Sequence, residues 1–321
     1  MITNARIVGV GCDPEEYHKQ DAARGTPEYV MSASALKLFD ECPSRFVAGY
    51  TPPDSDAKFH GSLLDTRLLT KEQFGKRYAI RPSTYKNEDG EEKPFNLNSK
   101  VCKSWVAEQG KKEIVSGDDV VACDQSIRRL MQDDIIASYL DASDRQVWLS
   151  GEWKDEATGL IVPLRGLVDA VPRADTVFAK TLGDIKTTRC AAASAWQRWC
   201  YQARYHVQAA LYIDLYQSAV PEGDRNTFCF ILSENFPPWE TGKRMLSQDF
   251  LELGRASYKR TLANYCQCLK TGRFPGYDDT DESVQGWGLV ACEPFMEQRD
   301  AFAPKYEFEP SEEPDEPINL N

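Results

Sequence analysis

The sequence lacks several features that would assign it to a common class of protein. Its 321 residues contain no apolar run close to the ~20 residues of a membrane-spanning helix, and the N-terminus lacks the basic-then-apolar pattern of an export signal. We therefore expect a cytoplasmic protein with no membrane association. The phosphate-binding sequence G-x-x-x-x-G-K-[ST] and the hydrolase sequence G-x-S-x-G are absent, and only three histidines occur. These absences argue against a P-loop ATPase and against a serine–histidine hydrolase.

The sequence also lacks an excess of basic residues. It has 38 Lys and Arg against 50 Asp and Glu, a net charge of −12, which argues against a protein coated by nucleic acid over its whole surface. Residues 306–321 hold six of the acidic residues and no basic one. Because an electrostatic field is local, an acidic protein can still hold DNA in a cleft that is lined with basic side chains.

The ten cysteines are spread along the chain without the spacing of a zinc site. Cys266 and Cys268 are close together, but no second close pair completes a set of four ligands. In a cytoplasmic protein we expect these cysteines to remain thiols.

Apolar residues recur at helical spacing in some stretches and alternate in others, so the sequence predicts a protein with both helices and strands. Residues 1–30 read as an irregular lead-in, and residues 291–321 as an acidic, disordered tail. Between them we expect one domain with a helical front part (31–140), a sheet (145–234), and a closing strand and helix (238–290). The expected helices cover about residues 31–50, 59–74, 98–109, 117–140, 191–220 and 248–271, and the expected strands 145–155, 160–171, 176–188, 226–234 and 238–246.

Two of the expected strands bring two acidic residues and a lysine together. Asp169 ends one apolar run, and Asp184, Ile185 and Lys186 occupy the next strand. Side chains alternate along a strand, so Asp184 and Lys186 share one face while Ile185 faces the core. A turn at residues 172–175 would place Asp169 beside Asp184. Neighbouring carboxylates repel each other unless a cation lies between them, and magnesium prefers such ligands. The alternative is a chance D-x-K sequence exposed on an edge strand.

The long helix expected over residues 191–220 carries a polar and aromatic stripe. Tyr201, Tyr205, Gln208 and Tyr212 are spaced by four, three and four residues, which would place them on one helix face. A buried glutamine needs hydrogen-bond partners, and a phosphate, a water molecule or Lys186 would serve. The alternative is a core helix whose tyrosines are satisfied within the protein.

These elements, in this order, resemble the PD-(D/E)XK nuclease superfamily. Asp169 followed by the D-I-K of residues 184–186 resembles its catalytic motif, and the Q-A-A-L-Y of residues 208–212 resembles the Q-x-x-x-Y element of its RecB-like branch. The S-x-S-x-L opening at residue 32 resembles that of the RecB-like and RecE-like nucleases, and the wider sequence YHVQAALY at residues 205–212 is closest in texture to the RecE-type and phage exonucleases. The resemblance implies an α/β fold of the restriction-endonuclease type, with a mixed central sheet flanked by helices.

The resemblance also assigns roles to individual residues. The catalytic set would be Asp169, Asp184, Lys186 and Gln208, and the metal ligands would be Asp65, Asp169, Asp184 and the backbone carbonyl of Ile185. One or two Mg²⁺ ions would be bound, and Mn²⁺ would substitute. Asp65 is a departure, because RecE-type nucleases carry a histidine four residues after the glycine that corresponds to Gly61. We prefer Asp65 to His60, which has the wrong spacing, because an aspartate supplies an oxygen ligand for magnesium.

Further residues are candidates for contacts with the substrate. Arg165, which lies four residues before Asp169, would contact a phosphate or hold the carboxylates apart. Tyr205, Tyr212 and Arg45 are further candidates for binding DNA, and Glu152 is a candidate metal or water ligand. The alternatives are that Arg45 is a solvated helix residue and that Glu152 is an unpaired surface residue.

The activity implied by the resemblance is magnesium-dependent cleavage of DNA. The type that it favours is a 5′→3′ exonuclease that digests double-stranded ends and leaves a 3′ strand for an annealing recombinase. Such proteins are bacterial or phage-encoded and form homo-oligomeric rings around DNA. Two alternatives stay open. One is a RecB-like nuclease that acts on single strands, on flaps or at internal sites, and the other is a DNA-binding module that has lost catalysis, with Asp65 as the first sign.

Some RecB-like nucleases hold an iron–sulfur cluster through one early cysteine and three late ones. The cysteines of this chain that would have to serve are Cys42, Cys266, Cys268 and Cys292. Their late spacing is narrower than the spacing usual for such a cluster. We therefore do not expect an iron–sulfur cluster.

Overall fold

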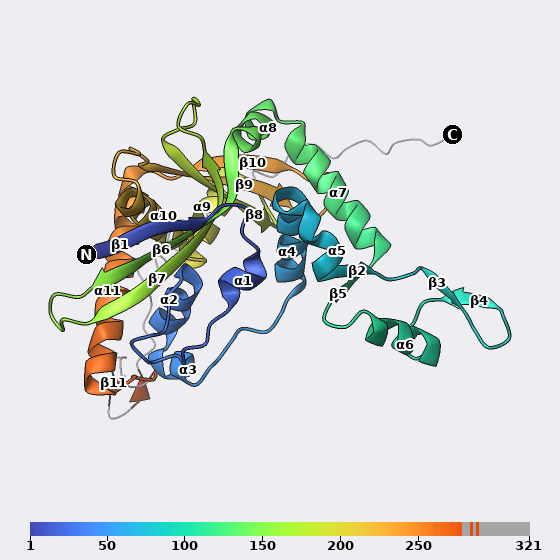
Figure 1. Ribbon diagram of the computed structural model, residues 1–321, viewed down its shortest axis with the longest axis horizontal. Helices are drawn as coiled ribbons and strands as arrows, with labels where there is room; N and C mark the ends of the chain where they lie inside the picture. The colour runs from blue at the N-terminus through green and yellow to red at the C-terminus, as the bar shows by residue number, and fades with distance from the viewer. Residues whose placement is uncertain (278–282, 285–286, 289–321) are drawn as a thin grey trace, which may run out of the picture. The chain divides into compact units, whose positions relative to one another are not determined.

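A six-stranded sheet runs through the centre of the computed structural model, which describes residues 1–277, 283–284 and 287–288 (Figure 1). The spatial order of the strands is β1-β6-β7-β8-β9-β10, and β8 and β9 are parallel whereas the other neighbours are antiparallel. The predicted mixed α/β fold is therefore confirmed. The strands are β1 (Ile2–Gly9), β6 (Ser143–Lys154), β7 (Ile161–Pro172), β8 (Thr181–Thr188), β9 (Thr227–Glu234) and β10 (Thr241–Met245).

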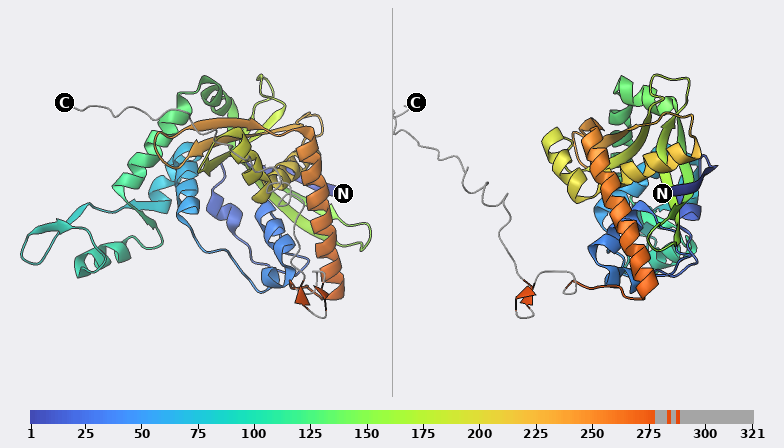
Figure 2. Two further views of the ribbon diagram at one scale, coloured as in Figure 1. Left: turned by 180° about the vertical axis from the view of Figure 1, so that it is seen from behind. Right: turned by 90° about the vertical axis from the view of Figure 1, so that its left-hand side faces the viewer.

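Helices cover both faces of this sheet, and each face has its own apolar core. On one face, side chains of β6 and β7 such as Leu149 and Leu164 pack against α2 (Ala33–Glu41), α9 (Ala193–Gln202), α10 (Tyr205–Ala219) and α11 (Gln248–Thr271). Figure 2 shows α11 crossing the outside of this layer. On the other face, Ala170, Ile185 and Ile231 pack against α4 (Asp56–Leu69), α7 (Gly117–Met131) and α8 (Asp134–Asp141). Burial on both faces explains why β7 and β9 are mostly apolar.

Several short elements lie in the N-terminal part of the chain, between the longer helices. They are α1 (Pro14–His18), α3 (Pro43–Val47), a 3₁₀ turn (Lys71–Gln73) and α5 (Phe74–Arg77). The segment that follows projects away from the sheet (Figures 1 and 2). It contains β2 (Tyr78–Ile80), β3 (Thr84–Lys86), β4 (Glu92–Pro94), α6 (Lys100–Glu108) and β5 (Glu113–Val115), with β2 paired to β5 and β3 to β4.

The first thirty residues differ from the irregular lead-in that we expected. They contribute β1, which pairs with β6 from Ile2↔Trp153 to Gly9↔Trp148, and then α1, which Asp13 caps. The β1 sequence, ITNARIVG, lacks clean alternation, and two register shifts interrupt its pairing. An edge strand of this kind is stabilised by its neighbour, which local sequence does not reveal.

Three expected helices are each broken in two. The first breaks before Pro43, whose ring fits the first turn of a new helix. The second breaks at Asp133, whose carboxylate accepts hydrogen bonds from the amides of Ile135 and Ile136 at the start of α8. The third breaks at Arg204, which has a φ of 58°. The third expected strand also begins at Thr181 rather than at residue 176, because a turn precedes it.

The chain forms two compact units, Met1–Gly276 and Tyr277–Asn321. Of the second unit, the structure describes β11 (Ser283–Val284) and β12 (Trp287–Gly288), which pair antiparallel. The expected tail at residues 291–321 and Cys292 lie outside the described residues. The cysteines within the described residues are all free. Among these same residues, no helix has both the length and the apolar content to cross a membrane.

Candidate active site

The pairing of β7 with β8 places the two predicted carboxylates next to each other. Ala170 pairs with Gly183 in antiparallel register, so Asp169 and Asp184 are cross-strand neighbours. Gly183 is required here, because a Cβ atom at this position would lie 2.5 Å from the Tyr139 hydroxyl of α8. The close approach of α8 therefore fixes this end of the sheet against the layer beneath it.

Hydrogen bonds hold both carboxylates in place. Asp169 accepts hydrogen bonds from Gln146 Nε2 at 3.0 Å and from the Ile185 amide at 2.8 Å. Asp184 accepts a hydrogen bond from Gln208 Nε2 at 2.6 Å and forms an ion pair with Lys186. The expectation that Asp184 and Lys186 share a strand face is confirmed by this ion pair. Asp169 and Asp184 are 8% and 2% exposed, so their orientation is set by the protein rather than by solvent.

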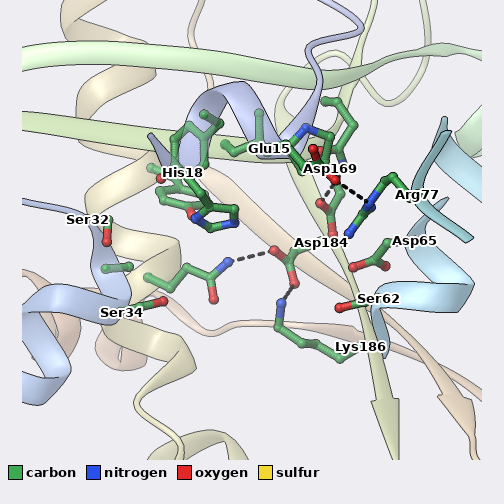
Figure 3. A pocket seen from close by; sticks show the side chains of 17 residues that line it. Glu15, His18, Ser32, Ser34, Ser62, Asp65, Arg77, Asp169, Asp184 and Lys186 are labelled. Carbon is green, nitrogen blue, oxygen red and sulfur yellow. Dashed lines mark hydrogen bonds and ion pairs between the residues drawn. The ribbon is translucent and has the colours of Figure 1, made fainter. Parts of the chain in front are cut away.

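These side chains line a cavity of about 280 Å³ that is shown in Figure 3. Asp184 lies near the centre of that view, with His18, Ser32 and Ser34 on one side and Ser62, Asp65 and Arg77 on the other. Asp65 comes from α4, which packs against β8. The full lining is Pro14, Glu15, Tyr17, His18, Ser32, Ala33, Ser34, Ser62, Asp65, Arg77, Gln146, Leu167, Asp169, Asp184, Lys186, Gln208 and Tyr212.

Burial and the charges of neighbouring side chains shift the pKa values of Asp65, Asp169 and Lys186. Burial raises the pKa of Asp65 to about 7; the charge of Lys186 opposes this rise and that of Asp184 adds to it. Burial also raises the pKa of Asp169 well above its ordinary value, and the charges of Asp184 and Asp65 add to the effect. Burial alone would lower the pKa of Lys186, but the carboxylates of Asp184 and Asp169 outweigh it and raise that pKa. The site therefore favours a positive charge beside its carboxylates.

The donor set fits a hard divalent cation. The carboxylates of Asp65, Asp169 and Asp184 line one cavity, and the raised pKa values of Asp65 and Asp169 show that a further cation would be stabilising there. Within the part of the chain that the structure describes, however, no three acidic, His or Cys side chains are grouped as closely as metal ligands are. Gln208 and Lys186 hold the Asp184 oxygens, and Gln146 and the Ile185 amide hold those of Asp169. Binding of an ion would exchange some of these contacts.

Helix α10 contributes the polar and aromatic stripe that the sequence predicted, except for its first member. Gln208 and Tyr212 line the cavity. The ring centroid of Tyr205 lies 5.2 Å from Lys186 Nζ, and the ring stacks on Trp196 at 5.6 Å. Tyr201 belongs to α9, before the break at Arg204, and is 58% exposed. The prediction of one face from Tyr201 to Tyr212 was therefore wrong at its first residue.

Three other residues considered from the sequence lie away from the cavity. Glu152 is six residues from Gln146 along β6, or about 20 Å at ~3.3 Å per residue, and its carboxylate accepts a hydrogen bond from Asn4. The structure therefore does not bring Glu152 to the carboxylates. His60 lines a separate small cavity beside α7, so the structure places Asp65, and not His60, with Asp169 and Asp184. Arg45 lies over the Tyr50 ring, with Cζ 3.7 Å from the ring centroid.

Arg165 has a structural partner in place of the expected phosphate. Its Nη1 donates hydrogen bonds to the backbone carbonyls of Tyr17 at 2.6 Å and of Lys19 at 3.0 Å, and its guanidinium lies over the Tyr17 ring. Arg165 is 8% exposed. It therefore anchors the chain segment around α1 and does not hold the two carboxylates apart.

Several cavity residues escaped the sequence analysis. Gln146, which holds Asp169, has a φ of 48°, a conformation that is uncommon outside glycine and tends to occur at functional sites. No local sequence pattern indicates that Gln146 would contact Asp169. Glu15 and His18 belong to α1, in the segment that we expected to be irregular, and Arg77 follows the expected second helix. The Pro14–Glu15–Glu16 start after Asp13 is a helix-start signal that could have revealed α1.

Comparisons with known proteins agree on the fold. The sequence model of a family described as a PDDEXK-like domain of unknown function matches residues 32–285. Among solved structures, the chain is similar to a protein from Eubacterium rectale that is provisionally described as an exonuclease. The two are 14% identical with a TM-score of 0.52, over 92% of this chain and 99% of the other. At that identity the likeness shows a shared fold. No curated protein sequence matches the chain.

Proposed function

The chain belongs to the family of PDDEXK-like domains, and from that membership and the geometry of its site we propose that it is a metal-dependent deoxyribonuclease. The observation that carries the proposal is the convergence of Asp169, Asp184, Lys186 and Gln208 on one cavity from β7, β8 and α10. A phosphodiester is an anion whose cleavage builds further negative charge. Fixed cations and hydrogen-bond donors around the reacting group stabilise that charge.

Lys186 is proposed to orient the reacting groups rather than to remove a proton. Its raised pKa keeps the ammonium group charged, so it donates hydrogen bonds to the attacking water or to the phosphate. Gln208 positions Asp184, and Gln146 positions Asp169. The Tyr205 ring beside the ammonium group restricts where Lys186 can point. Gly166 leaves room for the Tyr212 ring, because a Cβ atom there would lie 2.9 Å from it.

The residues proposed to hold a divalent ion are Asp65, Asp169 and Asp184, with the Ile185 carbonyl as the family resemblance implies. When bound, such an ion supplies Lewis acidity, which lowers the pKa of a coordinated water and stabilises charge on a phosphate. Asp65 replaces a neutral imidazole by a carboxylate, so the site has more negative charge than its relatives with histidine. This substitution favours a hard ion such as Mg²⁺ over softer transition metals.

We further propose the finer activity that the resemblance implies. The protein would digest double-stranded DNA ends in the 5′→3′ direction and leave a 3′ strand for a single-strand annealing recombinase. The sequence of residues 205–212 supports this type of nuclease. A homo-oligomeric ring belongs to the same proposal, and light scattering of the purified protein measures its size.

The test is digestion of linear duplex DNA, labelled at either the 5′ or the 3′ end, with Mg²⁺ and then with Mn²⁺. The wild type is compared with Lys186→Ala and with the control Lys180→Ala. Lys180 precedes β8, is exposed and pairs with Asp224, away from the cavity. We expect the wild type and Lys180→Ala to release label from one end of the DNA before the other. Lys186→Ala should release no label. The end that loses label first gives the polarity.

Two other outcomes would redirect the proposal. Equal cleavage of linear and covalently closed DNA would replace the exonuclease with an endonuclease. If linear, circular and single-stranded DNA all stay intact with both metals, the catalytic proposal fails. A DNA-binding module would then remain as the interpretation.

A further inference from the structure

A second, larger hollow adjoins the catalytic cavity. It has a volume of about 810 Å³ and shares His18, Ser32, Ala33, Ser34 and Gln208 with that cavity, so the two lie side by side. We call this second hollow the groove. Its walls are the segment after α1, helix α2, the loop before α4 with the start of that helix, and the start of α10.

The groove is basic although the whole chain is acidic. Its basic lining residues are Arg24, Lys37, Lys58, Arg165 and Arg204, and its one acidic lining residue is Glu41. Basic side chains along a groove are the feature that follows a nucleic-acid backbone. A DNA strand therefore has an electrostatically favourable path into the catalytic cavity from this side.

Part of the wall of the catalytic cavity is formed by residues that the groove does not share. Glu15 of α1 and Arg77 of α5 line the catalytic cavity alone, and their side chains meet with Glu15 Oε1 3.8 Å from Arg77 Nε. In Figure 3, Arg77 and Asp65 lie across Asp184 from Ser32 and Ser34, which border the groove. The carboxylate of Glu15 thus stands where a strand would leave the cavity.

Helix α1 is held rigidly in this position. Arg165 binds the carbonyls of Tyr17 and Lys19, and Tyr17 is 4% exposed and packs edge-to-face on Trp148. Before α1, the amide of Cys12 donates to the carbonyl of Gln146 at 3.2 Å. Helix α1 is therefore tied to the sheet on both of its sides.

We propose that α1 is an end stop that makes the catalytic cavity accept only the end of a DNA strand. A strand that fills the groove reaches Asp184 and cannot continue, because its next phosphate would meet the Glu15 carboxylate, and like charges placed together are costly. This inference rests on the proposed nuclease function and adds the part of the chain that would restrict the substrate to a strand terminus, helix α1 with Glu15. The family match begins at residue 32, so the end stop is built by chain outside it.

The test compares Glu15→Ala and Glu15→Gln with Glu16→Ala. Glu16 is the neighbouring exposed carboxylate of the same helix, pairs with Lys19 and does not line the cavity. Glu15 is also exposed, so all three variants should keep the melting temperature of the wild type. Each protein is given the linear and circular forms of one plasmid and of one single-stranded DNA, with Mg²⁺.

We expect the wild type and Glu16→Ala to cut linear forms and spare circular ones. Glu15→Ala should raise the circular-to-linear rate ratio by about tenfold, because a like charge and its bulk are removed. Glu15→Gln removes the charge alone and should give a smaller rise. Equal cutting of circular and linear DNA by the wild type, or an unchanged ratio in Glu15→Ala, would overturn the end stop.

A binding measurement separates this inference from the nuclease proposal. Without metal, the wild type should bind a linear oligonucleotide about tenfold more tightly than its circular form, and Glu15→Ala should remove that difference. If no DNA is cut but this preference and its loss are seen, the nuclease proposal fails and the end stop stands. If the two forms bind the wild type equally, the end stop fails whatever the activity.

Discussion

Two walls of the same cavity have different origins. One wall comes from β7, β8 and α10 and carries Asp169, Asp184, Lys186 and Gln208. The other comes from α1 and carries Glu15 and His18. The first lies within the segment that matches the family, and the second lies before it. The proposed chemistry therefore belongs to the part of the chain that matches the family, whereas the proposed limit on what enters belongs to the segment before it.

The two walls are also stabilised differently. The first is part of a sheet that is buried on both faces, with Ile185 only 2% exposed beneath the site. The second is a five-residue helix, too short to be stable alone. It depends on Tyr17 and on the hydrogen bonds that Arg165 donates. The first wall should therefore survive most surface changes, and the second should depend on a few contacts.

The largest expected effect is on nuclease activity, when Asp184→Asn removes a carboxylate from the first wall. The change removes a charge that pairs with Lys186 and that would bind a divalent ion. We expect nuclease activity to fall about a thousandfold or more, equivalent to ~4 kcal/mol of transition-state stabilisation. Calorimetry should show weaker Mg²⁺ binding.

Asp175→Asn is the matched control for this prediction. Asp175 is exposed in the turn between β7 and β8 and does not line the cavity. Its variant should keep full activity and full Mg²⁺ binding. Equal activity in Asp184→Asn and Asp175→Asn would show that the predicted catalytic carboxylate does no catalysis.

The first wall was predictable from the sequence because its geometry is local. Alternation along a strand set the common face of Asp184 and Lys186, and the antiparallel pairing of two consecutive strands set the register of Asp169. Helical spacing likewise placed Gln208 and Tyr212 together. Each of these inferences required only a regular element and its immediate neighbour.

The second wall could not be predicted because it depends on contacts between distant residues. Arg165 and Tyr17 are 148 positions apart, and neither sequence context indicates the other. The break at Arg204 has the same origin, since Arg204 pairs with Asp40 of α2 and donates to Ser257 of α11 at 2.6 Å. Local periodicity favoured one continuous helix there. Tertiary hydrogen bonds favoured a left-handed residue instead.

The next largest effect should come from detaching the second wall with Arg165→Met. Methionine keeps the apolar stem but leaves the carbonyls of Tyr17 and Lys19 without their charged donor. We expect the free energy of unfolding to fall by ~3 kcal/mol, because buried groups lose charge-assisted hydrogen bonds. Urea denaturation measures this change.

The control for this change is Arg173→Met. Arg173 donates one hydrogen bond to the Asp141 carbonyl at an exposed site, so its loss should cost less than ~1 kcal/mol. Hydrogen exchange adds a local readout, since protection of the α1 amides should fall in Arg165→Met alone. If both variants unfold at the same urea concentration as the wild type, the anchoring of α1 by Arg165 is wrong.

The smallest expected effect concerns His18, which belongs to the second wall and borders both the cavity and the groove. Burial lowers the pKa of His18, and the charges of Arg165, Arg77 and Lys58 lower it further, so the ring is neutral near pH 7. Within the described residues its nitrogens have no hydrogen-bond partner, and a phosphate at the junction would supply one. His18→Ala should therefore lower kcat/KM about tenfold, mainly through KM, because one hydrogen bond to a charged group is lost.

His60→Ala, which alters a separate cavity, is the matched control and should change kcat/KM by less than about twofold. If the two variants lose activity equally, α1 only closes the cavity and makes no contact with the strand.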